Sequence, residues 1–321
     1  MKEIGTNQMK SMKTKLTHQP LKKNCRIAII SPAGAVKESD LENTLDIIKE
    51  AGFEPVLGRY ALGEHEEGYK YSGSIKNRLE DLNWALNDES IDAVWATRGG
   101  YGCQHLLKGI QLNPSHKLPK WYVGYSDNTA IHSYLLKKGW NSINGQTIKT
   151  SNFQVDPNSY NLIFDVFKGI KPNYLVEAHE LNKKGEVEGV LVGGNLALVY
   201  ALLGSPYSFD FHDKILFLEE IGEEYYSLDR MITSLELAGA FDQIKGLIIG
   251  GMTCMGKKDQ NKNYESYYDP YSYELIASRL KQYDIPMLFG FPNGHIYDNR
   301  PLLIGSEVKL KVDTQCRIEF R

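Results

Sequence analysis

Short apolar segments alternate with amphipathic helical segments through the first half of the chain, and this alternation constrains the fold more than any other feature. The run Arg26 to Ile30 is typical of a buried strand. Leu41, Leu45 and Ile48 then mark one face of a helix, and Gly52 ends it. Because strands that alternate with helices form a parallel sheet covered on both faces, the pattern predicts an α/β domain. It continues with a strand at 55–57, a helix over 75–86 capped by Ser74, and strands at 91–96 and 121–123.

Residues 156–186 interrupt this pattern. Prolines and the polar run 182–185 replace the periodic apolar positions there, which predicts a linker. Beyond it we expect strands at 187–192, 215–218, 246–249 and 286–289, helices at 196–203 and 232–237, and a terminal hairpin of 308–312 with 317–320. The prediction is therefore a flexible leader at 1–23, an N-terminal parallel-sheet α/β domain at 24–155, a linker at 156–186, and a smaller mixed α/β C-terminal domain at 187–321.

The composition narrows the class of function. With 321 residues, 42% of them hydrophobic, the chain can bury two cores. A net charge of -3 and dispersed lysines do not suit a nucleic-acid partner, and no segment is apolar for long enough to span a membrane. The leader lacks the apolar run of a secretory signal, which predicts a cytoplasmic protein. The four cysteines have no close spacing and H-E-x-x-H is absent, so we expect no disulfide framework, no metal and no cofactor.

The segment Val123 to Ile131 predicts a strand that turns sharply at Ser126 and enters a helix. Gly124 permits a close backbone approach, and apolar residues recur at helical spacing after the turn. Ser126 would then stand at a helix N-terminus, where its hydroxyl is exposed and unpaired backbone N–H groups can receive a developing negative charge. This geometry suits a nucleophile. An ordinary N-cap serine fits the same stretch, since the residues around it do not match G-x-S-x-G.

A glycine-rich loop, 97–102, follows another strand and is a candidate binding or catalytic loop. Its three glycines let backbone N–H groups approach a ligand closely, as an oxyanion hole or a carboxylate-binding loop requires. Arg98 could bind a carboxylate through its fork of donors, or it could be a solvated charge. The loop matches neither G-x-G-x-x-G nor the lysine-containing P-loop, so a nucleotide site is weakly indicated. A plain tight turn is the simplest alternative. Because 31–34, 97–102 and 125–129 all follow strands, we expect them to converge.

The second half of the chain offers a carboxylate and a histidine. Glu219 ends a hydrophobic strand, where a carboxylate must be paired, so it is a candidate partner for a histidine. Glu220 and Glu223 compete for that role, and all three could be hydrated strand-end charges. His295 lies in a glycine-flanked turn after a strand and is free to reach a cleft, whereas His132 lies within a helix and is expected to pack or to face solvent.

Taken together, these segments resemble the L,D-carboxypeptidase family of serine peptidases, which includes murein tetrapeptide carboxypeptidases and relatives that confer immunity to microcin C. The resemblance spans nearly the whole chain after the leader. It rests, in the family's order, on Ser31-Pro32-Ala33-Gly34, Arg98-Gly99-Gly100-Tyr101-Gly102, Gly124-Tyr125-Ser126-Asp127, Gly193-Gly194-Asn195-Leu196, Leu216-Phe217-Leu218-Glu219 with Asp229-Arg230-Met231, and Gly294-His295.

The resemblance implies a catalytic triad of Ser126, His295 and Glu219. It implies an N-terminal α/β domain that carries the nucleophile, similar to the domain of class I glutamine amidotransferases, and a smaller C-terminal domain that carries the other two residues. The chain departs from the family at Asn144-Gly145-Gln146, where many members have His-Gly-Pro. This departure affects substrate contacts more than the hydrolytic chemistry, because no member of the proposed triad lies there.

The mechanism expected of such a triad adds further site residues. The backbone N–H of Asp127 and that of Gly99 or Gly100 would form the oxyanion hole. Arg98 and Tyr101 are candidates for contact with the substrate.

The expected activity is hydrolysis of the bond between an L-centre and a terminal D-alanine in murein tetrapeptides, through an acyl-enzyme. One alternative is hydrolysis of an aminoacyl-nucleotide peptide antibiotic, for which the tyrosine-rich segment 256–273 offers rings that could stack on a base. A second alternative is a noncatalytic protein that binds an anion at the glycine-rich loop. We expect a peptide or muropeptide partner and a homodimer, and no nucleic-acid or membrane partner.

Overall fold

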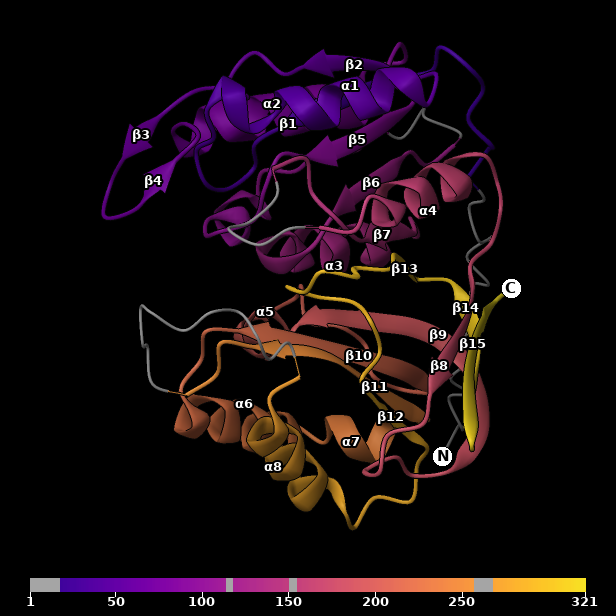
Figure 1. Ribbon diagram of the computed structural model, residues 1–321. Helices are drawn as coiled ribbons and strands as arrows, with labels where there is room; N and C mark the ends of the chain where they lie inside the picture. The colour runs from indigo at the N-terminus through magenta and orange to yellow at the C-terminus, as the bar shows by residue number, and fades with distance from the viewer. Residues whose placement is uncertain (1–17, 114–117, 150–154, 257–267) are drawn as a thin grey trace, which may run out of the picture.

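Two sheets organise the chain, as a computed structural model that describes residues 18–113, 118–149, 155–256 and 268–321 shows (Figure 1). The first sheet carries five parallel strands and one antiparallel edge strand, β13. In spatial order its strands are β13 (Leu302–Ile304), β7 (Ser142–Asn144), β6 (Trp121–Gly124), β5 (Ala93–Ala96), β1 (Arg26–Ile30) and β2 (Glu54–Leu57). Its helices are α1 (Glu42–Glu50), α2 (Ile75–Asn87), α3 (Thr129–Lys137) and α4 (Asn158–Phe167).

The second sheet is parallel on one side and antiparallel on the other. Its strands, in spatial order, are β12 (Met287–Phe289), β11 (Gly246–Thr253), β10 (Lys214–Ile221), β9 (Gly185–Asn195), β14 (Glu307–Val312), β15 (Gln315–Phe320) and β8 (Asn173–Glu177). Its helices are α5 (Leu196–Ala201), α6 (Tyr225–Leu237), α7 (Ala240–Gln243) and α8 (Pro270–Leu280). A small hairpin, β3 (His65–Glu66) with β4 (Lys70–Tyr71), and the 3-10 turns at 38–40, 103–106 and 126–128 complete the described elements.

The predicted mixed α/β architecture is confirmed. Strand β1 spans the expected residues, and Ser74 caps α2 by accepting a hydrogen bond from the Asn77 backbone N–H. The terminal hairpin of β14 and β15 forms as its alternating pattern indicates. Within the described residues, no helix has the length and apolar character needed to cross a membrane.

The segment 156–186 differs from the expected linker, because it contains α4 and β8. Phe164 and Phe167 of α4 pack against Trp95 of the first sheet, with ring centroids 5.8 Å apart in each pair. Strand β8 joins the second sheet as the edge strand beside β15. The amphipathic pattern of α4 is short and follows a proline, so composition alone gave the wrong structure for these residues.

The end of the expected leader also packs against the fold. His18 stacks on Trp121 with ring centroids 3.7 Å apart, and the Leu21 backbone N–H donates to the carbonyl of Phe167 at 2.6 Å. The expectation of a flexible leader at 1–17 concerns residues outside those described.

One segment crosses from the second sheet to the first. After β12, the chain passes through 290–301 and enters β13, which pairs with β7 in the first sheet (Figure 1). It then returns to the second sheet as β14 and β15. The expected C-terminal domain at 187–321 therefore supplies a strand to the N-terminal sheet. The crossing segment carries His295, so it determines where that side chain lies relative to the first sheet.

Candidate active site

Ser126 occupies a strained turn between β6 and α3. Its φ is +64°, in the left-handed region that a residue with a Cβ rarely adopts. Gly124 is required just before it, because a Cβ there would lie 2.7 Å from Asn128 Cγ. Neither the 3-10 turn 126–128 nor α3 is capped by a side-chain hydrogen bond. Ser126 is partly exposed, and the geometry favours a nucleophile turn over an ordinary N-cap serine.

Hydrogen bonds between buried polar groups hold this turn in place. Asn128 accepts a hydrogen bond from the Tyr122 hydroxyl at 2.5 Å and donates to the carbonyl of Tyr125 at 2.9 Å. His132 is fully buried, contrary to a solvent-facing position, and burial lowers its pKa to about 4. The neutral ring donates from Nε2 to the carbonyl of Gly124 and accepts at Nδ1 from the Ser142 hydroxyl, both at 2.8 Å.

The glycine-rich loop converges on Ser126, as predicted. The Gly34 backbone N–H donates to the carbonyl of Gly99 at 3.3 Å, which joins the loop after β1 to the loop after β5. A Cβ built on Gly99 would lie 3.0 Å from Ser126 Oγ and 3.3 Å from the backbone nitrogen of Asp127. Gly99 thus borders the space beside Ser126 and the backbone nitrogen of Asp127. Gly100 is exposed and has a φ of +112°.

The side chain of Asp127 ties the Ser126 turn to the end of the glycine-rich loop. Its Oδ2 accepts a hydrogen bond from the Cys103 backbone N–H at 2.8 Å. The carboxyl is almost completely buried, and desolvation raises its pKa to about 6, although the Cys103 N–H and Arg78 act in the opposite direction.

This raised pKa predicts how stability depends on pH. In the unfolded chain Asp127 loses its proton near pH 3.8, whereas in the folded chain it does so near pH 6. Between these values the folded state holds a proton that the unfolded state has lost, so this group's contribution to stability falls as pH rises and stays low above pH 6. The gap corresponds to about 3 kcal/mol at most.

The Asp127→Asn variant should therefore exceed the natural protein in free energy of unfolding at pH 8. Its amide oxygen can still accept from the Cys103 N–H. The gain should vanish towards pH 4, where the natural side chain is also neutral. Urea unfolding of both proteins at pH 4, 6 and 8 measures the difference, and a difference that does not change with pH would contradict the assignment.

Glu219 and His295 form the second half of the candidate site. His295 Nδ1–H donates to Glu219 Oε2 at 2.8 Å, and the two residues are 6% and 0% exposed. Gly294 must lack a side chain, because its φ is +123° and a Cβ would lie 2.8 Å from Glu219 Oε2. The ring of Tyr125, the residue before Ser126, lies 4.8 Å from the His295 ring between centroids. The turn with Ser126 and the pair of Glu219 and His295 are thus adjacent.

The competing carboxylates point elsewhere. Glu220 accepts hydrogen bonds from Asn195 Nδ2 at 2.9 Å and from the backbone N–H groups of Ala197 at 2.7 Å and Ile221 at 2.8 Å. Burial, and then the neighbouring Glu219, raise the pKa of Glu220 to about 8. Glu223 lies beyond the end of β10 and is partly exposed. Of the three, Glu219 is the carboxylate in contact with His295.

The two predicted substrate contacts lie at the rim of the site. Arg98 is partly buried, and its Nη1 donates to the carbonyl of Ala35 at 3.3 Å. Tyr101 is 46% exposed, and its ring packs against Tyr69 with centroids 6.0 Å apart. Sequence reasoning missed Tyr69, whose hydroxyl would lie 2.1 Å from a Cβ on Gly100. The only local signal for its position was the glycine turn at 68, which forms the β3–β4 hairpin.

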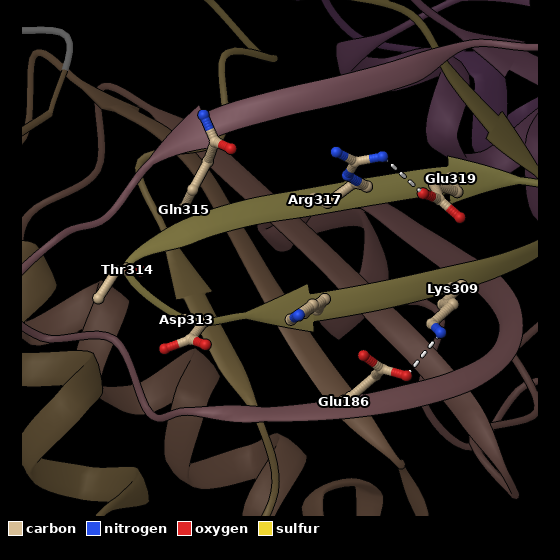
Figure 2. A pocket seen from close by; sticks show the side chains of 8 residues that line it. Glu186, Lys309, Asp313, Thr314, Gln315, Arg317 and Glu319 are labelled. Atoms are coloured by element: carbon tan, nitrogen blue, oxygen red, sulfur yellow. Dashed lines mark hydrogen bonds and ion pairs between the residues drawn. The ribbon is translucent and has the colours of Figure 1, made fainter.

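A hollow on the outer face of β14 and β15 lies away from these residues (Figure 2). Four of its charged side chains form two ion pairs, Lys309 with Glu186 at 2.6 Å and Arg317 with Glu319 at 3.1 Å, and Asp313 pairs with Lys184 at 3.1 Å. Strand β9 begins at this hollow and ends beside α3. A strand of this length is about 30 Å long, so the hollow lies about that far from the N-terminal end of α3. The hollow is a solvated face of ion pairs outside the candidate site.

Comparison with known proteins gives consistent similarities. The matching family models are described as the LD-carboxypeptidase N-terminal domain, over residues 27–145, and the LD-carboxypeptidase C-terminal domain, over residues 188–310. A putative carboxypeptidase of Synechocystis sp. is 30% identical over 297 residues, which cover 92% of this chain and 94% of the relative. The murein tetrapeptide carboxypeptidase of Pseudomonas aeruginosa is 29% identical over 309 residues, which cover 92% and 95%.

Two further similarities bear on the substrate and the fold. The microcin C7 self-immunity protein of Escherichia coli is 25% identical over 319 residues, which cover 88% of each chain. The crystal structure of muramoyltetrapeptide carboxypeptidase from Oxalobacter formigenes matches with a TM-score of 0.80 at 26% identity and covers 92% of this chain and 98% of that one.

Proposed function

The chain belongs to the LD-carboxypeptidase family of peptidases, and on this premise we propose that it is a serine carboxypeptidase that removes the terminal D-alanine of murein tetrapeptides. The observation that carries the proposal is the buried contact between His295 and Glu219 beside the strained turn at Ser126. A histidine that is held on one nitrogen by a carboxylate and is adjacent to a partly exposed serine is the arrangement that activates a serine.

Each residue of the triad has a distinct role. Glu219 accepts from His295 Nδ1, so the proton-free nitrogen of the neutral ring is Nε2. His295 Nε2 takes the hydroxyl proton as Ser126 Oγ attacks the carbonyl carbon of the L,D-amide. The C–N bond then breaks, and D-alanine leaves with that proton on its amine. Water, activated by the same histidine, hydrolyses the acyl-enzyme ester and restores the serine.

Backbone N–H groups stabilise the tetrahedral intermediate in this proposal. The Asp127 N–H faces the space bordered by Gly99, and an N–H from Gly99 or Gly100 supplies the second donor. The proposal also assigns Arg98 and Tyr101 to substrate contact at the rim, with Arg98 suited to the terminal carboxylate. The proposal retains the likeness of the N-terminal domain to that of class I glutamine amidotransferases as an expectation.

A second candidate substrate is an aminoacyl-nucleotide conjugate. It is favoured by the similarity to the microcin C7 self-immunity protein and by the contact between partly buried Tyr69 and exposed Tyr101. Most of the tyrosine-rich segment 256–273, at 257–267, lies outside the described residues. The same triad would hydrolyse such an amide.

Incubation of the purified protein with a murein tetrapeptide should release D-alanine, which an oxidase-coupled assay measures. We expect turnover of the tetrapeptide and at most weak turnover of an aminoacyl sulfamoyl nucleoside, measured by chromatography. Cleavage of the nucleoside conjugate alone would favour the second candidate. Turnover of neither would leave the family assignment in place and reject both substrates.

The proposal includes a cytoplasmic location and a homodimer. All four cysteines lie in the described residues and none of them forms a disulfide there, which supports a reducing compartment. Sedimentation of the purified protein would measure its oligomeric state.

A further inference from the structure

We propose that Asn144 and Asn293 are positioning residues for His295, which hold its turn against the end of β7 beside Ser126. The inference rests on the proposed function. It explains how residues from two different sheets are held together as one triad. It also gives a role to the segment Asn144-Gly145-Gln146, which departs from the family pattern.

The position of Asn144 in the first sheet makes it suitable for this role. In the parallel pair of β6 and β7, Asn144 is the register partner of Gly124, two residues before Ser126. In the antiparallel pair of β7 and β13, it is the register partner of Leu302, seven residues after His295. Asn144 therefore stands where the strand that leads to the serine and the segment that carries the histidine meet.

Asn144 and Asn293 form a reciprocal pair of hydrogen bonds. Asn144 Nδ2 donates to Asn293 Oδ1 at 2.8 Å, and Asn293 Nδ2 donates to the carbonyl of Asn144 at 3.1 Å. Asn293 Nδ2 also donates to the carbonyl of Arg300, at the far end of the His295 turn, at 2.7 Å. Both side chains are fully buried, so water cannot replace a lost bond without rearrangement. One amide thus ties both ends of the turn to β7.

A second amide pair restrains the same turn. Asn299 Nδ2 donates to Gln146 Oε1 at 3.1 Å, and the Gly294 N–H donates to Asn299 Oδ1 at 3.2 Å. The backbone nitrogen next to His295 is therefore linked through Asn299 to Gln146, two residues after the end of β7. From the second sheet, Thr253 Oγ1–H donates to the carbonyl of His295 at 3.0 Å.

These contacts hold His295 on the sheet that carries Ser126, while Glu219 belongs to the other sheet. Without the Asn144 contact the turn can shift, and a displacement of about 1 Å at a catalytic group can cost about 10²-fold in rate. Asn144 and Asn293 are fully buried, whereas Tyr101, a proposed substrate contact, is 46% exposed, so the role proposed here concerns the triad and not the substrate contacts expected of residues 144–146. We therefore expect loss of the contact to lower kcat and to leave KM almost unchanged.

The test compares Asn144→Leu with Asn141→Leu. Leucine nearly matches asparagine in shape but cannot donate to Asn293 Oδ1, whereas the backbone carbonyl at position 144 still accepts from Asn293 Nδ2. Asn141 is a matched control, because its Nδ2 donates to Ser306 Oγ at 3.0 Å and so joins the same two chain segments away from the His295 turn. For D-alanine release, Asn144→Leu should lower kcat by about 10–100-fold with KM within about threefold, and Asn141→Leu should change kcat by less than about threefold.

A measurement that does not depend on turnover distinguishes failure of this inference from failure of the proposed substrate. The proton between His295 Nδ1 and Glu219 is observable by NMR as a downfield resonance, assigned by its loss in His295→Gln. Its exchange with water should be at least about 10-fold faster in Asn144→Leu than in Asn141→Leu. Equal exchange or equal kcat in the two variants would overturn the inference. Failure of the natural protein to release D-alanine would reject the substrate alone.

Discussion

Alanine in place of Ser126 is expected to lower the rate of D-alanine release by at least about 10⁴-fold, because it removes the only atom proposed to form a covalent bond with the substrate. The rest of the site stays in place: His295 keeps its bond to Glu219, and the backbone nitrogen of Asp127 still lies beside Gly99. Residual catalysis by these groups sets the lower limit of the rate. The rate of D-alanine release under saturating tetrapeptide measures the loss.

Stability provides the control for this variant. Serine and alanine both carry a Cβ, so the strain at a φ of +64° is the same in both, and the temperature of unfolding should not change. Ser126→Gly removes the hydroxyl and relieves the strain. It should be as inactive as Ser126→Ala and no less stable. Retention of more than about a tenth of the natural rate in either variant would show that Ser126 is not the nucleophile.

The sequence was sufficient for those elements whose signals are local. The strand β1 and the cap at Ser74 each depend on residues within one turn or strand, so pattern and capping chemistry predict them. The turn at Ser126 is of the same kind, since a strand, a glycine and a helical pattern lie within a few residues. The convergence of the three loops followed from the rule that parallel strands place their carboxyl ends at one edge.

Elements whose position depends on residues far away in the chain could not be predicted from local sequence patterns. Strand β13 has three residues and pairs with β7, about 160 positions earlier in the chain, so no local period indicates the sheet to which it belongs. The same holds for the amide pairs of Asn144 and Gln146, because an isolated asparagine or glutamine carries no sign of its partner. Among Glu219, Glu220 and Glu223, the residues alone left the choice open. Only the fold shows that Glu220 points to Asn195 and Glu219 to His295.

Glutamine in place of Glu219 should lower kcat by about 10⁴-fold, a loss comparable to that expected for a triad whose histidine is held in the wrong tautomer. Glu219 Oε2 accepts from His295 Nδ1, which leaves Nε2 free to take the serine proton. An amide that presents its NH₂ group to Nδ1 reverses this arrangement, so that Nε2 carries the proton and cannot act as a base. Even an amide that presents its oxygen lacks the charge that stabilises the imidazolium.

The matched control is Glu223→Gln, which makes the same chemical change four residues further along, outside β10. It should alter kcat by less than about threefold, because Glu219 alone of these carboxylates contacts His295. NMR adds a test of the cause: the downfield proton of His295 should disappear or shift in Glu219→Gln and stay unchanged in Glu223→Gln. A Glu219→Gln enzyme that keeps both its rate and this resonance would exclude a carboxylate role at position 219. A loss of rate in Glu223→Gln alone would move the triad to the competing glutamate.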